Sequence, residues 1–172
     1  MKKSDSKTSM RQRLEERTQP TKPVIMYQNW RDLLFLHWPV PTDSLQPHLP
    51  EGLTADTFED TAWIGVVPFR MEKVRPRFLP SMPGLSDFPE LNLRTYVVDR
   101  NGRPGVWFFS LDTNHRLAKG IARNFFHLNY CYSQIQTAVL PDGTMEYKAT
   151  RLDKDKEEPS MPQTYRWKRK GE

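Results

Sequence analysis

Proline and glycine divide the apolar residues of this chain into short runs. The 172-residue sequence contains 15 prolines and 8 glycines, and the apolar runs between them have strand length, as in WRDLLFLHW and VWFFSLD. Short apolar runs bounded by Pro, Gly, Asn and Asp are typical of β-strands, and Asn101-Gly102 and Pro141-Asp142-Gly143 predict hairpin turns. We therefore expect about seven strands between residues 24 and 152.

Two segments interrupt this pattern. In TNHRLAKGIARNFF, apolar residues recur at helical spacing between Leu117 and Phe126, after an N-cap at Asp112, Thr113 or Asn114. RPRFLPSMPGLSDFP, residues 75 to 89, has four prolines and one glycine and predicts a long, stiff loop; loops of that length are often functional. Many strands and one helix favour a mainly β fold, with a predominantly antiparallel sheet that is curled or closed around the helix.

The stretch FPELNLRTYVVD, residues 88 to 99, is the best candidate for a site. In a strand, Glu90, Asn92, Arg94 and Tyr96 share one face. If that face meets bulk water, the strand is half-buried and ordinary. If it faces inward, a carboxylate, an amide, a guanidinium and a phenol converge on one enclosed space, where Arg94 binds an anion and Glu90 acts as acid or base. Strand periodicity fits both readings.

Few other residues suggest a site. Arg123, on the flank of the predicted helix, either turns into the same cavity as a ligand-binding residue or extends to water. The histidines, His37, His48, His115 and His127, show none of the close spacings of zinc motifs, and no Gly-rich phosphate loop or nucleophile elbow is present. We expect neither a metal nor a cofactor.

The net charge of +5 belongs to the terminal segments. Residues 1–22 hold seven Lys or Arg against three acids, and residues 153–172 hold six against five, so that the charges between them cancel. A nucleic-acid surface needs Lys and Arg gathered on a folded face, and a nucleic-acid partner is therefore not expected. The predicted organisation is a disordered basic tail at 1–23, one domain at 24–152 and a charged tail at 153–172.

Cys131 is the only cysteine, which excludes an intrachain disulfide and favours a reducing compartment. The N-terminal segment lacks the apolar run of a secretory signal, and no segment approaches the roughly 20 apolar residues of a spanning helix. We expect a cytoplasmic protein with no membrane partner.

Several motifs occur in a characteristic order: WRDLLFLHWPV, LPEGL, AWIGVVPFRM, FPELNLRTYV, PGVWFFSLD and the AR-x-x-F of residues 122–126. In this order they resemble the YqjF-like family of uncharacterised bacterial proteins over roughly residues 27 to 151. The resemblance implies the acetoacetate decarboxylase-like fold, a curved and partly closed antiparallel β-barrel around a central cavity that the face of residues 90–96 lines. Relatives usually continue with further strands, so this chain looks like a shortened version with an exposed sheet edge. Such an edge pairs with another chain in a homo-oligomer, is covered by the tail of the chain, or leaves the fold marginally stable.

The resemblance does not extend to the catalytic lysine. Acetoacetate decarboxylase works through a lysine with a lowered pKa, and the matching region here, GIARNFFHLNY, has Leu128, Asn129 and Tyr130 in place of the lysines, while Lys119 does not match. The expected function is binding of a small carboxylate-type molecule without Schiff-base chemistry. The alternative is a non-catalytic binding or scaffold module with no enclosed site.

Overall fold

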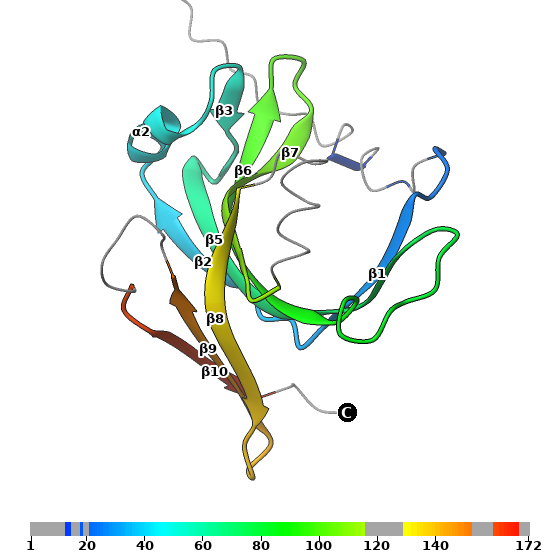
Figure 1. Cartoon of the computed structure of the whole chain (residues 1–172). Coiled ribbons are helices and arrows are strands. Elements are labelled where there is room, and N and C mark those ends of the chain that lie inside the picture. Colours follow the sequence, from blue (N-terminus) through cyan, green and yellow to red (C-terminus); the bar gives the residue numbers. More distant parts are fainter. Residues whose placement is uncertain (1–12, 15–17, 19–20, 116–128, 153–159, 169–172) are drawn as a thin grey trace, which may run out of the picture. The chain divides into compact units, whose positions relative to one another are not determined.

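The structure is a computed structural model that describes residues 13–14, 18, 21–115, 129–152 and 160–168 (Figure 1). Within these residues the fold is mainly β, as the sequence predicts. The elements in chain order are β1 (Met26–Arg31), β2 (Leu36–Val40), the short helix α2 (Thr42–Leu45), the 3-10 turn η1 (Gln46–His48), β3 (Leu53–Ala55), β4 (Thr57–Phe58), β5 (Thr61–Pro76), β6 (Phe88–Asp99), β7 (Pro104–Thr113), β8 (Tyr130–Val139), β9 (Thr144–Arg151) and β10 (Gln163–Lys168).

The chain divides into two compact units that alternate along the sequence. Unit 1 contains Met1–Pro23, His37–Gly65 and Arg94–Trp107, and unit 2 contains Val24–Leu36, Val66–Leu93 and Phe108–Glu172. Hydrogen bonds join the strands in the order β1-β5-β6-β7-β8-β9-β10, with β2 and β4 paired to β5 and β3 paired to β6. The long strands β5, β6 and β7 contribute residues to both units, which no change in composition along the chain could reveal.

Unit 1 is held together by side chains that bond to the backbone. The amide of Gln46 donates to the carbonyl of Leu53 and accepts from the N–H of Ala55, both at 2.9 Å. This pair of bonds joins the α2–η1 turn to β3. Thr95, which is fully buried, donates its hydroxyl to the carbonyl of Trp63 at 2.8 Å. The short helix α2 begins at Thr42, directly after Pro41.

The N-terminal segment also contributes a contact to unit 1. The guanidinium of Arg13 donates to both carboxylate oxygens of Asp56, at 2.7 and 2.6 Å. The hydrogen bonds to Asp56 raise the pKa of Arg13, against the effect of burial. The segment that the sequence assigns to a tail therefore includes at least one anchored residue.

Unit 2 contains both antiparallel and parallel pairs of strands. β1 pairs with β5 in antiparallel register from Met26↔Pro76 to Arg31↔Arg70. Strands β8, β9 and β10 are antiparallel and lie side by side (Figure 1). β7 and β8 are parallel, from Leu111↔Tyr130 to Thr113↔Tyr132, whereas the sequence favours antiparallel pairing. Parallel strands need a crossover of a dozen or more residues, usually a helix, and the helix predicted for 117–126 falls in this connection, outside the described residues.

The core of unit 2 consists of two apolar clusters. One contains Val67, Phe69, Met71 and Phe88, and the other contains Leu91, Ile135, Tyr147 and Ala149 with Tyr165 and Trp167 packed against them. In each cluster, side chains two positions apart share a strand face, as the period of a β-strand requires. The two clusters bury the faces of β5, β6, β8 and β9 that carry the alternating apolar residues.

Two expectations from local pattern were wrong. WRDLLFLHW is not one strand, because Asp32 adopts a positive φ of 53° and separates β1 from β2. Its carboxylate lies 3.3 Å from Arg70. In the predicted C-terminal tail, residues 163–168 form β10, which pairs with β9 from Gln163↔Ala149 to Lys168↔Thr144. Tyr165 and Trp167 alternate along β10 and each lies 6.5 Å, between ring centroids, from Tyr147.

Both predicted hairpin turns are present, with Gly102 and Gly143 at φ of 77° and 79°. None of the helices among the described residues is long and apolar enough to cross a membrane.

The hydroxyl of Tyr147 is buried in this core and has no hydrogen-bond partner within the described part of the chain. An unpaired buried hydroxyl costs roughly 1–3 kcal/mol, so we expect Tyr147→Phe to raise the free energy of unfolding by about 1 kcal/mol, measured by urea denaturation. Tyr130→Phe is the control and is expected to lower it, because the Tyr130 hydroxyl donates to Glu90. A Tyr147→Phe variant less stable than the wild type would contradict the unpaired hydroxyl.

Candidate functional site

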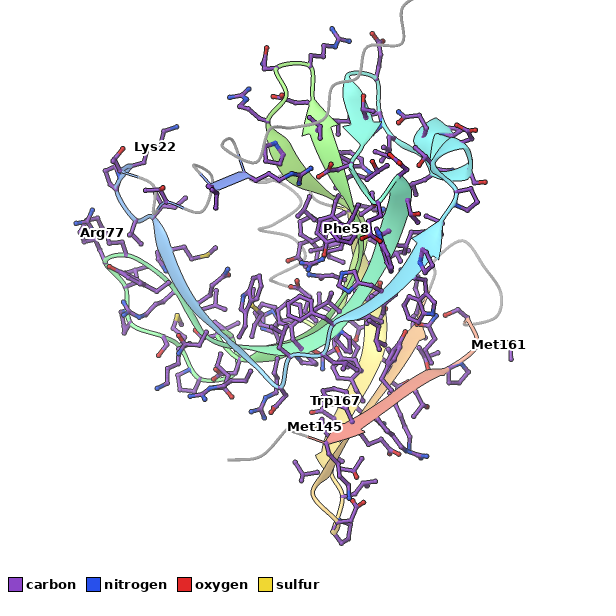
Figure 2. All side chains as sticks on the ribbon, turned by 180° about the vertical axis from the view of Figure 1, so that it is seen from behind. Lys22, Phe58, Arg77, Met145, Met161 and Trp167 are labelled. Atoms are coloured by element: carbon purple, nitrogen blue, oxygen red, sulfur yellow. The ribbon has the colours of Figure 1, made fainter. Side chains whose placement is uncertain are left out.

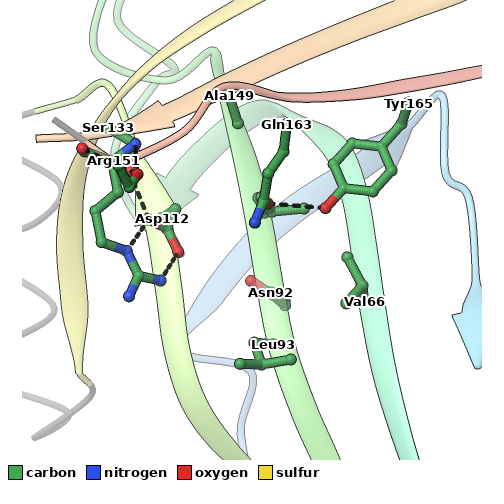
Figure 3. A pocket seen from close by; sticks show the side chains of 11 residues that line it. Val66, Asn92, Leu93, Asp112, Ser133, Ala149, Arg151, Gln163 and Tyr165 are labelled. Atoms are coloured by element: carbon green, nitrogen blue, oxygen red, sulfur yellow. Dashed lines mark hydrogen bonds and ion pairs between the residues drawn. The ribbon is translucent and has the colours of Figure 1, made fainter. Parts of the chain in front are cut away.

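Unit 2 contains a cavity of about 290 Å³ (Figure 3). This volume is near the lower end of the range for small-molecule sites. Its lining combines apolar side chains such as Val66 and Ala149 with polar side chains from five strands: Asn92 of β6, Asp112 of β7, Ser133 of β8, Arg151 of β9 and Gln163 and Tyr165 of β10. A small cavity with several converging polar groups is the usual form of a site for a small polar ligand.

One wall of the cavity is an ion pair between Asp112 and Arg151. Arg151 donates Nε–H to Oδ1 at 2.7 Å and Nη2–H to Oδ2 at 2.6 Å, so the pair is bidentate (Figure 3). Ser133 also donates its hydroxyl to Oδ1, at 2.5 Å. The Asp112 side chain is nearly buried, whereas that of Arg151 is about one third exposed. The positive member of the pair is therefore the one that solvent reaches.

Asn92 presents an unpaired acceptor to this cavity. The side chain lines the cavity (Figure 3), is only 3% exposed, and has an Oδ1 atom without a hydrogen-bond partner among the described residues. Its amide bonds to the carboxylate of Glu90, which only an N–H can do when that carboxylate is ionised. The carbonyl oxygen is then left for a group inside the cavity. A buried acceptor of this kind normally finds a partner.

Glu90 is 2% exposed and lies next to Asn92 in this arrangement. Tyr130 donates its hydroxyl to Glu90 Oε2 at 2.9 Å. Burial raises the pKa of Glu90 to about 7, although the hydrogen bonds from Tyr130 and Asn92 act in the opposite direction. Burial and the neighbouring charge of Glu90 raise the pKa of Tyr130 in turn. Glu90 is thus a buried carboxyl whose proton exchanges near neutral pH.

The other two residues of the predicted face, Arg94 and Tyr96, belong to unit 1. Nε2 of His37 lies 2.7 Å from the Tyr96 hydroxyl, and Arg94 donates Nη2–H to the same oxygen at 3.5 Å. Burial, and then the charge of Arg94, lower the pKa of His37. Gly65 leaves room for this cluster, because a Cβ there would lie 3.2 Å from Nε2 of His37.

The four residues of the predicted face on strand 88–99 do not share one environment. Glu90 and Asn92 do not meet bulk water, and Asn92 lines a cavity. Arg94 and Tyr96 are half-buried, and the Tyr96 hydroxyl lies beside both Arg94 and His37. Arg123 lies outside the described residues. The anion-binding role of Arg94 and the acid–base role of Glu90 stay predictions.

Sequence reasoning missed the ion pair that forms the wall of the cavity. Asp112 ends VWFFSLD, a strand that is apolar on both faces, and Arg151 ends β9. A lone carboxylate in such a strand is buried and requires a partner. That signal was present in the sequence, but periodicity does not identify which of 26 basic residues supplies the partner.

Comparison with known proteins gives a family match and one close relative. The profile of the family DUF2071, described as "Uncharacterized conserved protein", matches residues 27–171. The "Uncharacterized protein YqjF" of Bacillus subtilis (strain 168) is 47% identical over 133 residues, which cover 77% of this chain and 54% of that protein. The chain therefore spans about half the length of this relative.

Two solved structures share the fold. An acetoacetate decarboxylase from Legionella pneumophila matches with a TM-score of 0.55 at 13% identity, over 80% of this chain and 56% of that one. An acetoacetate decarboxylase-like enzyme from Sphingomonas wittichii RW1 matches with a TM-score of 0.56 at 15% identity, over 74% of this chain and 55% of that one. At these identities the likeness shows the acetoacetate decarboxylase-like fold, as the sequence resemblance implied.

The pKa of Glu90 predicts how stability changes with pH. The folded chain keeps this proton up to about pH 7, whereas the ordinary pKa is 4.5. Between these values the folded state binds the extra proton, so the free energy of unfolding falls as the pH rises through this window, by about 3 kcal/mol in total. We expect Glu90→Gln to remove this fall, which urea denaturation at both ends of the window measures.

Glu51→Gln is the matched control, because Glu51 is an exposed glutamate of unit 1 that bonds to Arg100. It is expected to leave the pH dependence unchanged. Equal pH dependence in the wild type and Glu90→Gln would show that Glu90 is ionised throughout the window.

Proposed function

The chain belongs to the DUF2071 family, and from the cavity in unit 2 we propose that it binds a small carboxylate-type molecule there, in the cytoplasm. The observation that carries the proposal is the Oδ1 atom of Asn92, buried, unpaired among the described residues and part of the cavity wall. A buried acceptor without a partner costs roughly 1–3 kcal/mol. A ligand that brings an O–H or N–H to this atom removes that cost.

The ion pair supports the carboxylate part of the ligand. Arg151 is the partly exposed member of the pair, and a ligand carboxylate next to it would share the guanidinium with Asp112. Sharing makes this contact weaker than one to an unpaired arginine. The bond to Asn92 should therefore provide most of the selectivity, and we expect a hydroxy acid to bind better than the same acid without its hydroxyl group.

Glu90 supports the site through Asn92. The described residues that line the cavity do not include Glu90, but its carboxylate accepts the amide N–H of Asn92. This bond fixes which end of the amide faces the cavity. We assign Glu90 a positioning role in binding, in place of direct contact with the ligand.

Lysine chemistry has no support at this site. No lysine occurs among the described residues that line the cavity. Tyr130, one of the residues that the resemblance sets in place of the decarboxylase lysines, donates its hydroxyl to Glu90. The fold by itself does not carry the decarboxylase reaction, so the proposal is binding without a Schiff base.

A thermal melt of the chain with small hydroxy, keto and unsubstituted carboxylic acids tests this function. A ligand at 100 times its dissociation constant adds about 2.7 kcal/mol of stability, or roughly 5–10 °C for a chain of this size. We expect the largest shift with a hydroxy acid. In Asn92→Leu the shift at the same concentration should fall to about half or less, because loss of the acceptor weakens binding about tenfold or more.

Asn29→Leu is the matched control, since Asn29 is an exposed asparagine in β1 of the same unit. It should keep the full shift. Arg94→Met tests the clamp that the sequence predicts: a shift lost in Arg94→Met but kept in Asn92→Leu would move the ligand site to unit 1. A cooperative melt that no acid changes would support the scaffold alternative.

A further inference from the structure

A second surface of unit 2 combines exposed apolar side chains from two segments. We define it by residues 24–27 and 73–85, which are the start of β1 and the end of β5 with the loop that follows. The tip residue Phe78 is 87% exposed, and Leu79, Met82 and Ile25 are also exposed. The backbone N–H of Arg77 donates to the carbonyl of Ile25 at 3.0 Å, so the two segments are adjacent. Exposed apolar side chains grouped in this way usually mark an interaction surface.

The same surface holds cations without carboxylate partners. In unit 2, six described Lys and Arg residues each form an ion pair with Asp or Glu: Arg31, Arg70, Lys148, Arg151, Arg166 and Lys168. The described cations of this unit that form none are Lys73, Arg75 and Arg77, at alternate positions of one segment. The nearest acid after them, Asp87, accepts the backbone N–H of Lys73.

Aromatic rings occupy the place of carboxylates beside two of these cations. The guanidinium of Arg75 lies 4.5 Å from the centroid of the Tyr27 ring, and that of Arg77 lies 5.2 Å from the Phe78 ring. A cation–π contact leaves the positive charge unneutralised. The surface therefore has three positive charges among exposed apolar side chains. This combination complements a partner with anionic groups on its outside and apolar groups directly below them.

The backbone of the loop is suited to a medium with little water. Pro76, Pro80 and Pro83 have no N–H to satisfy. Most of the other N–H groups bond within the surface or its base: Arg77 to Ile25, Leu79 to Pro76, Leu85 and Ser86 to Met82, and Met82 to the Ser86 hydroxyl. Backbone groups that enter the hydrocarbon core of a bilayer must be satisfied internally, and five N–H groups between residues 77 and 86 are bonded in this way.

We propose that this surface binds the interface of an anionic lipid membrane, with Phe78, Leu79 and Met82 among the acyl chains and the three cations at the headgroups. Apolar tips with flanking Lys and Arg are the signature of interfacial binding, and each cation near an anionic leaflet contributes to affinity. This surface fits a nucleic acid less well, because the phosphate backbone would contact the cations but leave the protruding apolar side chains without a partner. The sequence predicts no membrane partner, and the proposed contact departs from that prediction; it requires no spanning segment.

Co-sedimentation with lipid vesicles tests the proposal. We expect the full chain to bind phosphatidylcholine vesicles that contain about one third phosphatidylserine, and to bind pure phosphatidylcholine far less, with affinity falling as salt is added. Arg75→Gln/Arg77→Gln should weaken binding about fivefold for each charge removed. Lys148→Gln/Arg166→Gln removes two cations that pair with Glu146 and should change little.

The apolar tips have their own matched control. Phe78→Ser/Leu79→Ser should weaken binding tenfold or more because it removes the inserted apolar area. Val139→Ser/Met161→Ser alters two exposed apolar residues of the same unit, of which Met161 is 87% exposed like Phe78; Figure 2 shows Arg77 and Met161 on opposite sides of the picture. This control should bind as the wild type does.

Three results would overturn the proposal. One is no binding to anionic vesicles at low salt. Another is binding that Phe78→Ser/Leu79→Ser leaves unchanged. The third is the absence of vesicle binding together with binding of an oligonucleotide, or dimerisation, that depends on Phe78 and Leu79.

Discussion

Unit 2 depends on one buried carboxylate. Asp112 belongs to β7, its hydroxyl donor Ser133 to β8 and its ion-pair partner Arg151 to β9, so the three strands meet at a single charged group. Such a charge is costly to bury unless it is paired and hydrogen-bonded, and loss of either partner destabilises strongly. The pair lies where parallel pairing of β7 and β8 gives way to the antiparallel pairs of β8, β9 and β10, and it also forms a wall of the cavity. Stability and the candidate site therefore share the same residues.

The polarity of the cavity follows from a second buried carboxylate. Glu90 accepts from Tyr130 and Asn92, and this arrangement leaves the Asn92 carbonyl oxygen unpaired. In the fold shared with acetoacetate decarboxylase, a tyrosine bonded to a glutamate stands at one of the positions that the resemblance assigns to lysines. A shared fold does not by itself carry the decarboxylase reaction.

Charge totals and charge placement lead to different conclusions about partners. Between residues 23 and 152 basic and acidic residues cancel, and this balance argues against any charged surface. The structure shows why the argument is incomplete. Acids pair with Arg31, Arg70 and Arg151, whereas the side chains of Lys73, Arg75 and Arg77 form no ion pair among the described residues, and aromatic rings lie beside the two arginines. A balanced sequence can thus fold into a locally basic, apolar surface.

The sequence by itself determined the mainly β fold, both hairpin turns, a strand at residues 88–99, and the family. These properties depend on neighbours a few positions apart, because strand period and turn geometry are local. Only the tertiary structure decided that β7 and β8 are parallel, that residues 163–168 form a strand, that Asn92 lines a cavity, that Tyr96 lies beside His37, and that Asp112 pairs with Arg151. Each of these depends on contacts between distant segments, and their free energy comes from burial and pairing that no local pattern contains.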